Sequence, residues 1–186
     1  RAYGLEGTTL RAWEILQSDD QPTIGLQTWS EDVPCRGAVV RLAMVDAEGT
    51  LLVLVTQSGQ LAECETGSIW RYADRGTNAE VLAQGQMPEP QLGGYIRSVE
   101  VLGANKAVYG ARYAYVIDGK VTSVLGLVDR KTLEPLAFLT PEEPWQTVLT
   151  EDAVFLLAGH SVEKWTLDGF RLWRSDLPIY PASEYG

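Results

Sequence analysis

Histidine, cysteine and long apolar runs are scarce in this sequence, and each scarcity excludes a class of protein. The single histidine, His160, cannot supply the several imidazoles of a histidine-rich zinc site. The two cysteines, Cys35 and Cys64, are too few for a disulfide framework or a four-cysteine zinc site. The longest aliphatic stretches, residues 51–55 and 153–158, fall far short of the roughly 20 residues of a membrane-spanning helix. We therefore expect no metal site of these kinds and no membrane span.

The two cysteines leave two arrangements open. They either form one disulfide in an oxidising compartment or remain as two half-buried free thiols. No basic-then-apolar leader opens the sequence, and the chain begins with Arg1 rather than Met, as a processed product would. The compartment is left undetermined.

Positive charge is also in short supply. The 186 residues include 15 Lys plus Arg against 25 Asp plus Glu, which gives a formal net charge of −10. This balance argues against the basic footprint of proteins that bind nucleic acids or anionic membranes. An acidic surface instead suits a basic protein partner. With 45% hydrophobic and 22% charged residues, the composition is that of one folded domain.

Motifs of enzymatic chemistry are missing as well. The sequence has no Gly-x-Ser-x-Gly elbow, and its Gly-plus-Lys segments at 103–106 and 118–120 lack the spacing of phosphate-binding loops. His160 falls between two apolar runs and is predicted to lie in an exposed turn. We therefore predict no catalytic residues and no cofactor.

The residues that are present favour an all-β fold. Apolar runs at 39–45, 51–56, 61–65 and 68–72 are separated by short turns that contain glycine, which is typical of an antiparallel meander. The chain also contains 18 Gly and 9 Pro, which leave few windows for an amphipathic helix.

Aromatic residues recur at the ends of these meanders. Trp29 and Trp70 are 41 residues apart, and Phe138 and Trp173 are 35 apart. A four-stranded unit of roughly 40 residues has the size of a β-propeller blade. We predict that these four aromatics occupy the closing strands of successive blades and wedge between them.

The repeat divides one domain, 1–186, into about four blades of four antiparallel strands. The predicted parts are the outer strands of a first blade at 8–29, a second blade at 37–73, an insertion loop at 73–94, a third blade at 95–139, a fourth at 145–175 and a closing tail at 177–186. Two arrangements are predicted as alternatives. The tail completes the first blade and closes a small ring, or the chain is part of a larger propeller whose open edges pair with another chain or copy.

Two segments carry a resemblance to a known family. Residues 58–70 and 162–173 each hold a strand, a Gly-containing turn and a strand that ends in Trp. This pattern resembles the repeat of the quinoprotein-like (PQQ-like) β-propellers, a WD40-like architecture. The turn of the first segment has Glu65 where Asp is usual, and the third repeat has no Trp. The resemblance implies the propeller fold and does not imply a cofactor.

The remaining aromatics and carboxylates are the candidates for binding. Tyr113 and Tyr115 share one strand face, and Tyr95 follows two glycines at the start of a blade. Glu63 and Glu65 are predicted to share a face of the strand at 61–65 as an acidic stripe. Trp145 completes this set.

Two functions are weighed for this chain. The leading hypothesis is a non-enzymatic protein-binding propeller module with a basic protein partner. The alternative is a fragment of a quinoprotein-like dehydrogenase or of a carboxylate-dependent hydrolase.

Overall fold

The chain forms four antiparallel β-sheets. The structure is a computed structural model that describes residues 1–17, 21–45, 49–88, 94–141 and 145–178, and within these ranges it contains no helix. The all-β prediction is confirmed. The described part of the chain accordingly has no helix that is long and apolar enough to cross a membrane.

Each sheet is a simple meander in chain order. Sheet 1 consists of β1 (Ala2–Glu6), β2 (Thr9–Leu16) and β3 (Thr23–Asp32). Sheet 2 consists of β4 (Ala38–Val45), β5 (Thr50–Ser58), β6 (Ser68–Asp74) and β7 (Ala79–Gln86). Sheet 3 consists of β8 (Tyr95–Ala104), β9 (Val108–Ile117), β10 (Lys120–Asp129) and β11 (Pro135–Leu139). Sheet 4 consists of β12 (Trp145–Leu149), β13 (Ala153–Ala158), β14 (Ser161–Thr166) and β15 (Arg171–Asp176).

Tight turns produce these meanders. Between β9 and β10, Asp118 and Gly119 both have positive φ, at 49° and 75°. This is the backbone of a type I′ turn, whose twist matches that of the two strands it joins. Ile117 consequently pairs with Lys120, and the ladder runs without a shift to Val108 and Asp129.

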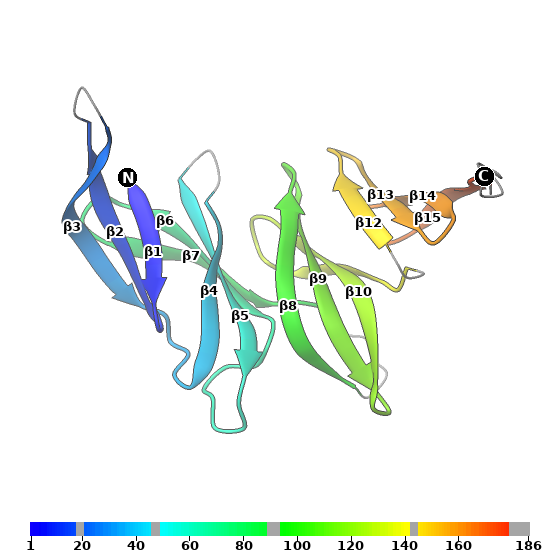
Figure 1. Ribbon diagram of the computed structural model, residues 1–186, viewed down its shortest axis with the longest axis horizontal. Helices are drawn as coiled ribbons and strands as arrows, with labels where there is room; N and C mark the ends of the chain where they lie inside the picture. Colours follow the sequence, from blue (N-terminus) through cyan, green and yellow to red (C-terminus); the bar gives the residue numbers. More distant parts are fainter. Residues whose placement is uncertain (18–20, 46–48, 89–93, 142–144, 179–186) are drawn as a thin grey trace, which may run out of the picture.

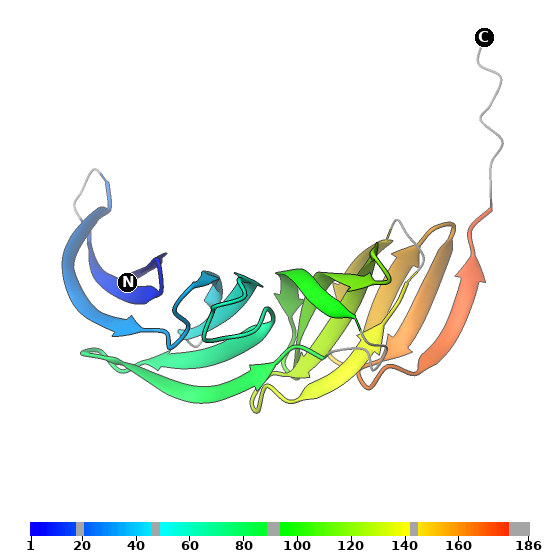
Figure 2. The same ribbon diagram turned by 90° about the horizontal axis from the view of Figure 1, so that it is seen from below.

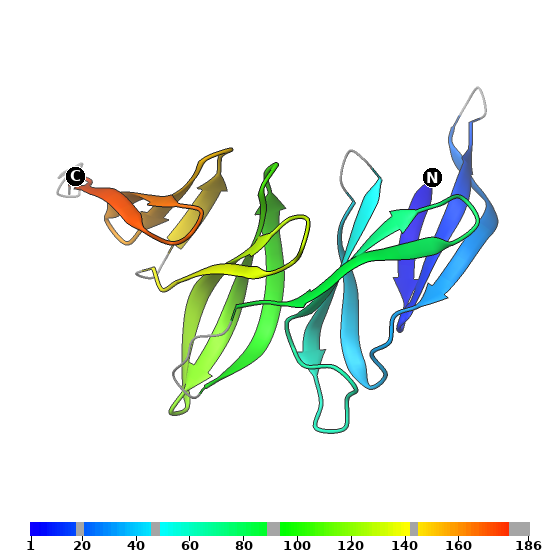
Figure 3. The ribbon, with the colours of Figure 1, turned by 180° about the vertical axis from the view of Figure 1, so that it is seen from behind.

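The four sheets are stacked face to face in chain order along an open arc (Figures 1 and 2). The first strands of the sheets follow the concave side of the arc, and the last strands follow its convex side (Figure 2). Figure 3 views the molecule from the side of β7 and β11. One apolar cluster fills each of the three junctions between neighbouring sheets.

Strand β5 contributes side chains to the apolar clusters on both faces of sheet 2. Leu51 and Val53 pack toward sheet 1, whereas Leu52 and Leu54 pack toward sheet 3. Successive side chains of a strand point to opposite faces, so an uninterrupted apolar run is needed where both faces are covered.

The arc is open, and the small closed ring that the sequence suggested is not formed by the described residues. Sheets 1 and 4 lie at opposite ends of the molecule (Figure 1). Of the predicted closing tail at 177–186, only residues 177 and 178 are described, and the rest lies outside the described residues. The amide of Leu177 donates to the carbonyl of His160 in sheet 4, at 2.7 Å, so the tail begins beside the sheet that precedes it.

Two segments of sheet 2 differ from the sequence prediction. Residues 61–65 are turns and bends rather than a strand, and the predicted insertion loop at 73–94 contains β7. The disulfide partner Cys64 lies in the first of these segments, and its position is set by the cross-link rather than by strand pairing. Strand β7 was missed because half of its residues are exposed and it includes glycine and glutamine, which hide its alternation.

Sheet 1 also has a strand beyond the prediction. The sequence placed the first blade at 8–29, whereas β1 precedes that range and pairs with β2 along its whole length. Sheet 1 is therefore a three-stranded sheet.

The cysteines form a disulfide, which decides between the two arrangements that the sequence left open. Cys35 lies in the connection from sheet 1 to sheet 2, and Cys64 lies in the loop between β5 and β6. Their Cα atoms are 5.2 Å apart, and Cys35 is fully buried.

The four predicted closing aromatics do not occupy equivalent positions. Trp29 in β3 and Trp70 in β6 are buried in the junction between sheets 1 and 2, but Trp70 is on the third strand of its sheet. Phe138 in β11 packs toward sheet 2. Trp173 in β15 is 43% exposed and contacts Phe155 of its own sheet. The aromatic spacing in the sequence therefore did not predict equivalent positions, because strand β7 follows Trp70 in sheet 2, whereas Trp29, Phe138 and Trp173 lie on the last strands of their sheets.

Candidate functional site

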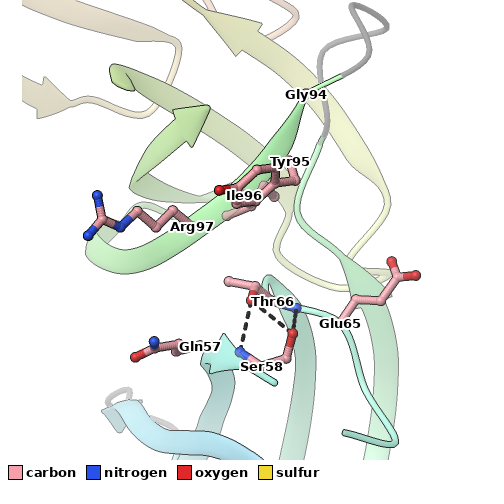
Figure 4. A pocket seen from close by; sticks show the side chains of 8 residues that line it. All are labelled: Gln57, Ser58, Glu65, Thr66, Gly94, Tyr95, Ile96 and Arg97. Carbon is pink, nitrogen blue, oxygen red and sulfur yellow. Dashed lines mark hydrogen bonds between the residues drawn. The ribbon is translucent and has the colours of Figure 1, made fainter. Parts of the chain in front are cut away.

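Two pockets of about 420 Å³ each lie between sheets 2 and 3. The first pocket is lined by Gln57, Ser58, Glu65, Thr66, Gly94, Tyr95, Ile96 and Arg97 (Figure 4). The second is lined by Arg41, Leu42, Ala43, Leu54, Thr56, Val99, Glu100 and Val101. Both pockets lie against successive residues of β8, and we call them together the groove.

A reciprocal pair of hydrogen bonds fixes one wall of the groove. The amide of Ser58 donates to Oγ1 of Thr66 at 3.0 Å, and the amide of Thr66 donates to Oγ of Ser58 at 3.1 Å (Figure 4). Nε2 of Gln86 also donates to the carbonyl of Thr66 at 2.9 Å. Because Thr66 is buried, these bonds satisfy polar groups that water cannot reach, and they hold the ends of the loop 59–67 together.

The opposite wall is the start of β8. Tyr95 is 60% exposed, whereas the neighbouring Ile96 is buried in the junction between sheets 2 and 3. The amide of Gly94 donates to the hydroxyl of Tyr115 at 2.9 Å. A Cβ atom at Gly94 would lie 2.2 Å from the carbonyl oxygen of Val116, so only glycine fits there. The backbone before Tyr95 is thus held in place by Tyr115 and by its close approach to Val116.

We expect Gly94→Ala to lower the free energy of unfolding by about 1.5 kcal/mol, because the added methyl group must displace backbone. Urea unfolding followed by tryptophan fluorescence measures the change. Gly103→Ala, within β8, is the matched control, since a Cβ atom there meets nothing within 4 Å. Equal stability of the two variants would contradict the close approach at Gly94.

Charged side chains stand at both ends of the first pocket. Glu65 and Arg97 are exposed and extend away from each other on either side of Tyr95 (Figure 4). In the second pocket, Arg41 and Glu100 are exposed as well. The groove therefore offers both signs of charge around an exposed aromatic ring.

The structure brings two of the six predicted binding residues together. Tyr95 and Glu65 line the first pocket of the groove. The tyrosines of β9 do not line it: Tyr113 and Tyr115 are each 1% exposed, and their hydroxyls bond the carbonyl of Pro88 and the amide of Gly94. Tyr115 is accordingly a positioning residue for the wall that carries Tyr95.

Trp145 and Glu63 lie elsewhere. Trp145 is buried between sheets 3 and 4, where the guanidinium of Arg112 lies 4.1 Å from its ring centroid. Glu63 accepts a hydrogen bond from the amide of Arg36 at 3.3 Å and lines a separate pocket beside Pro34.

The predicted acidic stripe of Glu63 and Glu65 is wrong. The two residues are in a loop rather than a strand, and the disulfide-bonded Cys64 lies between them. The loop directs Glu63 toward Arg36 and Glu65 to the groove. The rule that residues two apart share a face holds only within a strand.

Sequence reasoning missed Ser58, Thr66 and Arg97. Ser58 and Thr66 were visible as turn residues, but the sequence gave no signal that their hydroxyl groups would pair. Arg97 lies at a β-bulge in β8, where the register shifts between Ile96 and Ser98. A bulge re-aims a side chain and cannot be located from alternation alone.

The groove residues supply hydrogen bonds, an aromatic surface and charge, which are the means of non-covalent recognition. Within the described ranges, no group of three or more His, Cys, Asp or Glu residues is placed to hold a metal ion.

No family model matches the chain. No curated protein matches it at a significant level.

Proposed function

We propose that this chain is a non-enzymatic protein-binding module of the β-propeller type, and that a basic protein partner binds in the groove. The propeller reading is supported by the stack of antiparallel meanders in chain order, one of three strands and three of four, with first strands inside an arc and last strands outside. The open arc favours part of a larger propeller over a small ring.

The observation that carries the proposal is the exposed Tyr95 beside Glu65 on a rigid groove. Tyrosine side chains concentrate binding energy at protein interfaces because they bury a large area at low entropic cost. The wall beneath Tyr95 is fixed by Gly94 and Tyr115, and the facing wall by Ser58 and Thr66. A partner therefore meets a site that is already ordered, which lowers the cost of binding.

Charge selects the kind of partner. A net charge of −10 steers a basic protein toward the module and raises its association rate at low salt. Glu65 then provides a carboxylate at the groove for a basic side chain. No observation favours the alternative of a dehydrogenase or hydrolase fragment.

We expect Tyr95→Ala to weaken binding of the basic partner by at least about tenfold, the effect of removing an interface anchor. The immobilised chain is used to retain proteins from a cell lysate at low salt, and retained proteins are identified by mass spectrometry. Affinities of the purified partner for wild type and variant are then measured by biolayer interferometry.

Glu65→Lys tests the charge of the groove and has a matched control. Glu14→Lys makes the same charge change on an exposed position of sheet 1, away from the groove. We expect Glu65→Lys to slow association more than Glu14→Lys does, because only the former acts at the site. The proposal would be overturned if the wild type retained no protein. It would also be overturned if Tyr95→Ala and Glu65→Lys bound the partner as well as the wild type and Glu14→Lys do.

A further inference from the structure

A further pocket, of about 230 Å³, is lined by basic side chains and shares no described residue with the groove. Its described lining residues are Arg71 of β6, Lys106 between β8 and β9, and Arg130 and Lys131 between β10 and β11. They are four of the 15 Lys plus Arg in a chain that carries −10. Like charges repel one another, so this grouping costs stability. We call these four residues the basic pocket.

Arg71 places a cation on a sheet face that another sheet covers. Alternation along β6 sends Arg71 to the same side as Ile69, which packs toward sheet 3, whereas Trp70 packs toward sheet 1. Nη1 of Arg71 donates to the carbonyl of Lys131 at 3.5 Å, and Nε is buried without a hydrogen-bond partner. Among the described residues, Arg71 forms no ion pair. One long bond to a neutral carbonyl compensates poorly for a partly buried charge.

The two lysines of the basic pocket keep most of their charge available. Asp129 precedes Lys131 by two residues, but its carboxylate already accepts hydrogen bonds from the amides of Lys131 and Thr132, each at 2.8 Å. The amide of Thr132 is the main cause of the lowered pKa of Asp129, and the charge of Lys131 contributes least. Lys106 pairs with Glu151 at 2.5 Å, but the two side chains are 82% and 71% exposed, so water weakens the pair. An entering anion therefore displaces Glu151 at little cost.

Arg130 holds together the two connections that carry these lysines. Its amide donates to the carbonyl of Ala107 at 2.8 Å, and its Nη1 donates to the carbonyl of Asn105 at 3.1 Å. Oδ1 of Asn105 in turn accepts from the amides of Ala107 and Val108 at 2.8 and 2.7 Å. Arg130 is therefore a positioning residue, and the backbone around the basic pocket is ordered before a ligand arrives, which lowers the cost of binding.

We propose that the basic pocket binds a small anion of the diphosphate type. The pocket gathers more positive charge than a single carboxylate neutralises, and a diphosphate carries several negative charges in a compact group. Phosphate oxygens accept paired hydrogen bonds from a guanidinium group, and lysine ammonium groups bind phosphate as point charges. Arg71 would thereby gain the counter-charge that the described residues do not supply.

An extended polyanion such as a nucleic acid or an anionic membrane is disfavoured. Outside the basic pocket it would meet the remaining surface of a chain with 25 Asp plus Glu and only 15 Lys plus Arg, and that surface repels it. A small ligand contacts the basic pocket alone. Because the basic pocket and the groove share no described residue, this proposal is independent of the proposed function.

Isothermal titration calorimetry of the full chain with sodium pyrophosphate, in the absence of divalent cations, tests the proposal. We expect one site with a micromolar Kd at low salt. The Kd should rise at least about tenfold in half-molar salt, because salt screens the attraction between the anion and the pocket. Orthophosphate, which carries fewer charges, should bind more weakly than pyrophosphate.

Matched variants locate the site. Lys131→Gln and Arg71→Met are each expected to raise the Kd for pyrophosphate at least about tenfold, since each removes a charge-assisted contact. Lys120→Gln makes the same charge change as Lys131→Gln at the opposite, exposed end of β10 and should leave the Kd unchanged. Without ligand, Arg71→Met should melt no lower than the wild type, because it replaces a partly buried cation that has no acidic partner among the described residues.

Three results would overturn the proposal. The first is the absence of saturable binding of pyrophosphate to the wild type. The second is an equal loss of binding in Lys120→Gln and Lys131→Gln, which would show that net charge rather than the basic pocket attracts the anion. The third is tighter binding of heparin than of pyrophosphate through Arg71 and Lys131, which would replace the small ligand by an extended polyanion.

Discussion

Replacement of Cys35 and Cys64 by serine is expected to lower the free energy of unfolding by about 3.5 kcal/mol. The disulfide joins residues 29 apart in sequence, and closing a loop of that length removes entropy from the unfolded chain by about this amount. Cys35 is fully buried, so a serine there also places a hydroxyl in an apolar cluster.

Urea unfolding of the wild type and the double serine variant measures this effect. Dithiothreitol serves as the control, because it should destabilise the wild type and leave the variant unchanged. Unfolding midpoints that coincide for oxidised wild type and variant would show that the cross-link contributes nothing to stability.

A second large loss of stability is expected when Asp74 is replaced, at the junction between sheets 1 and 2. The carboxylate of Asp74, at the end of β6, is only 9% exposed and accepts hydrogen bonds from four donors. The donors are Nη1 of Arg1 at 2.5 Å, OH of Tyr3 at 2.9 Å, Nε1 of Trp29 at 3.0 Å and the amide of Gly76 at 2.7 Å. Three of these residues belong to the sheet 1 segment, so one side chain ties the two sheets together.

We expect Asp74→Ala to lower the free energy of unfolding by about 3 kcal/mol, because it leaves Arg1 and the indole of Trp29 without their acceptor. Glu80→Ala is the control. Glu80 pairs with Arg75 at 2.5 Å, but both side chains are about half exposed, and exposed pairs contribute about 1 kcal/mol or less. A loss at Asp74 no larger than that at Glu80 would contradict the role of the buried carboxylate.

The same group gives stability a defined dependence on pH. Burial by itself would raise the pKa of Asp74, but the hydrogen bonds to its carboxylate outweigh burial and lower the pKa to about 2 from an ordinary 3.8. Folding therefore favours the ionised form. The ionised Asp74 carboxylate therefore adds about 2 kcal/mol to the free energy of unfolding above pH 3.8, and this stabilisation is lost as the pH falls toward 2.

Acid titration of the two proteins isolates this contribution. The difference in unfolding free energy between wild type and Asp74→Ala should be constant near neutral pH and should narrow below pH 3.8. A difference that stays constant down to pH 2 would show that the carboxylate has the same pKa in the folded and unfolded chain.

Sheets 3 and 4 span residues 95–139 and 145–176, close to the ranges 95–139 and 145–175 that the sequence predicted for the third and fourth blades, whereas sheets 1 and 2 differ more from their predicted ranges. Strands β9 and β10 are apolar-rich runs joined by an Asp-Gly turn, and they pair along their whole lengths without a shift. In sheet 2, a disulfide-bonded loop takes the place of the expected strand at 61–65, and an exposed strand follows it. Cross-links and exposed outer strands leave little trace in hydrophobic periodicity.

The candidate site was only partly predictable for a related reason. Alternation placed Tyr113 and Tyr115 on one face, but it does not reveal which face another sheet covers, and both rings proved to be buried. Tyr95 was identified because two glycines precede it, and glycine marks a place where backbone approaches closely. The contribution of Thr66 depends on Ser58, and only folding places their hydroxyl groups together.

The stacking of the sheets has a consequence for how the molecule opens. Among the described residues, each sheet packs on its immediate neighbours, so sheets 2 and 3 are covered on both faces and sheets 1 and 4 on one. In such a nearest-neighbour array, local opening starts at the ends. Amide hydrogens of β5 and β9 should therefore exchange slowest with solvent. Among the last strands of the four sheets, β15 should exchange fastest. Exchange rates should rise from the centre of the arc toward both of its ends.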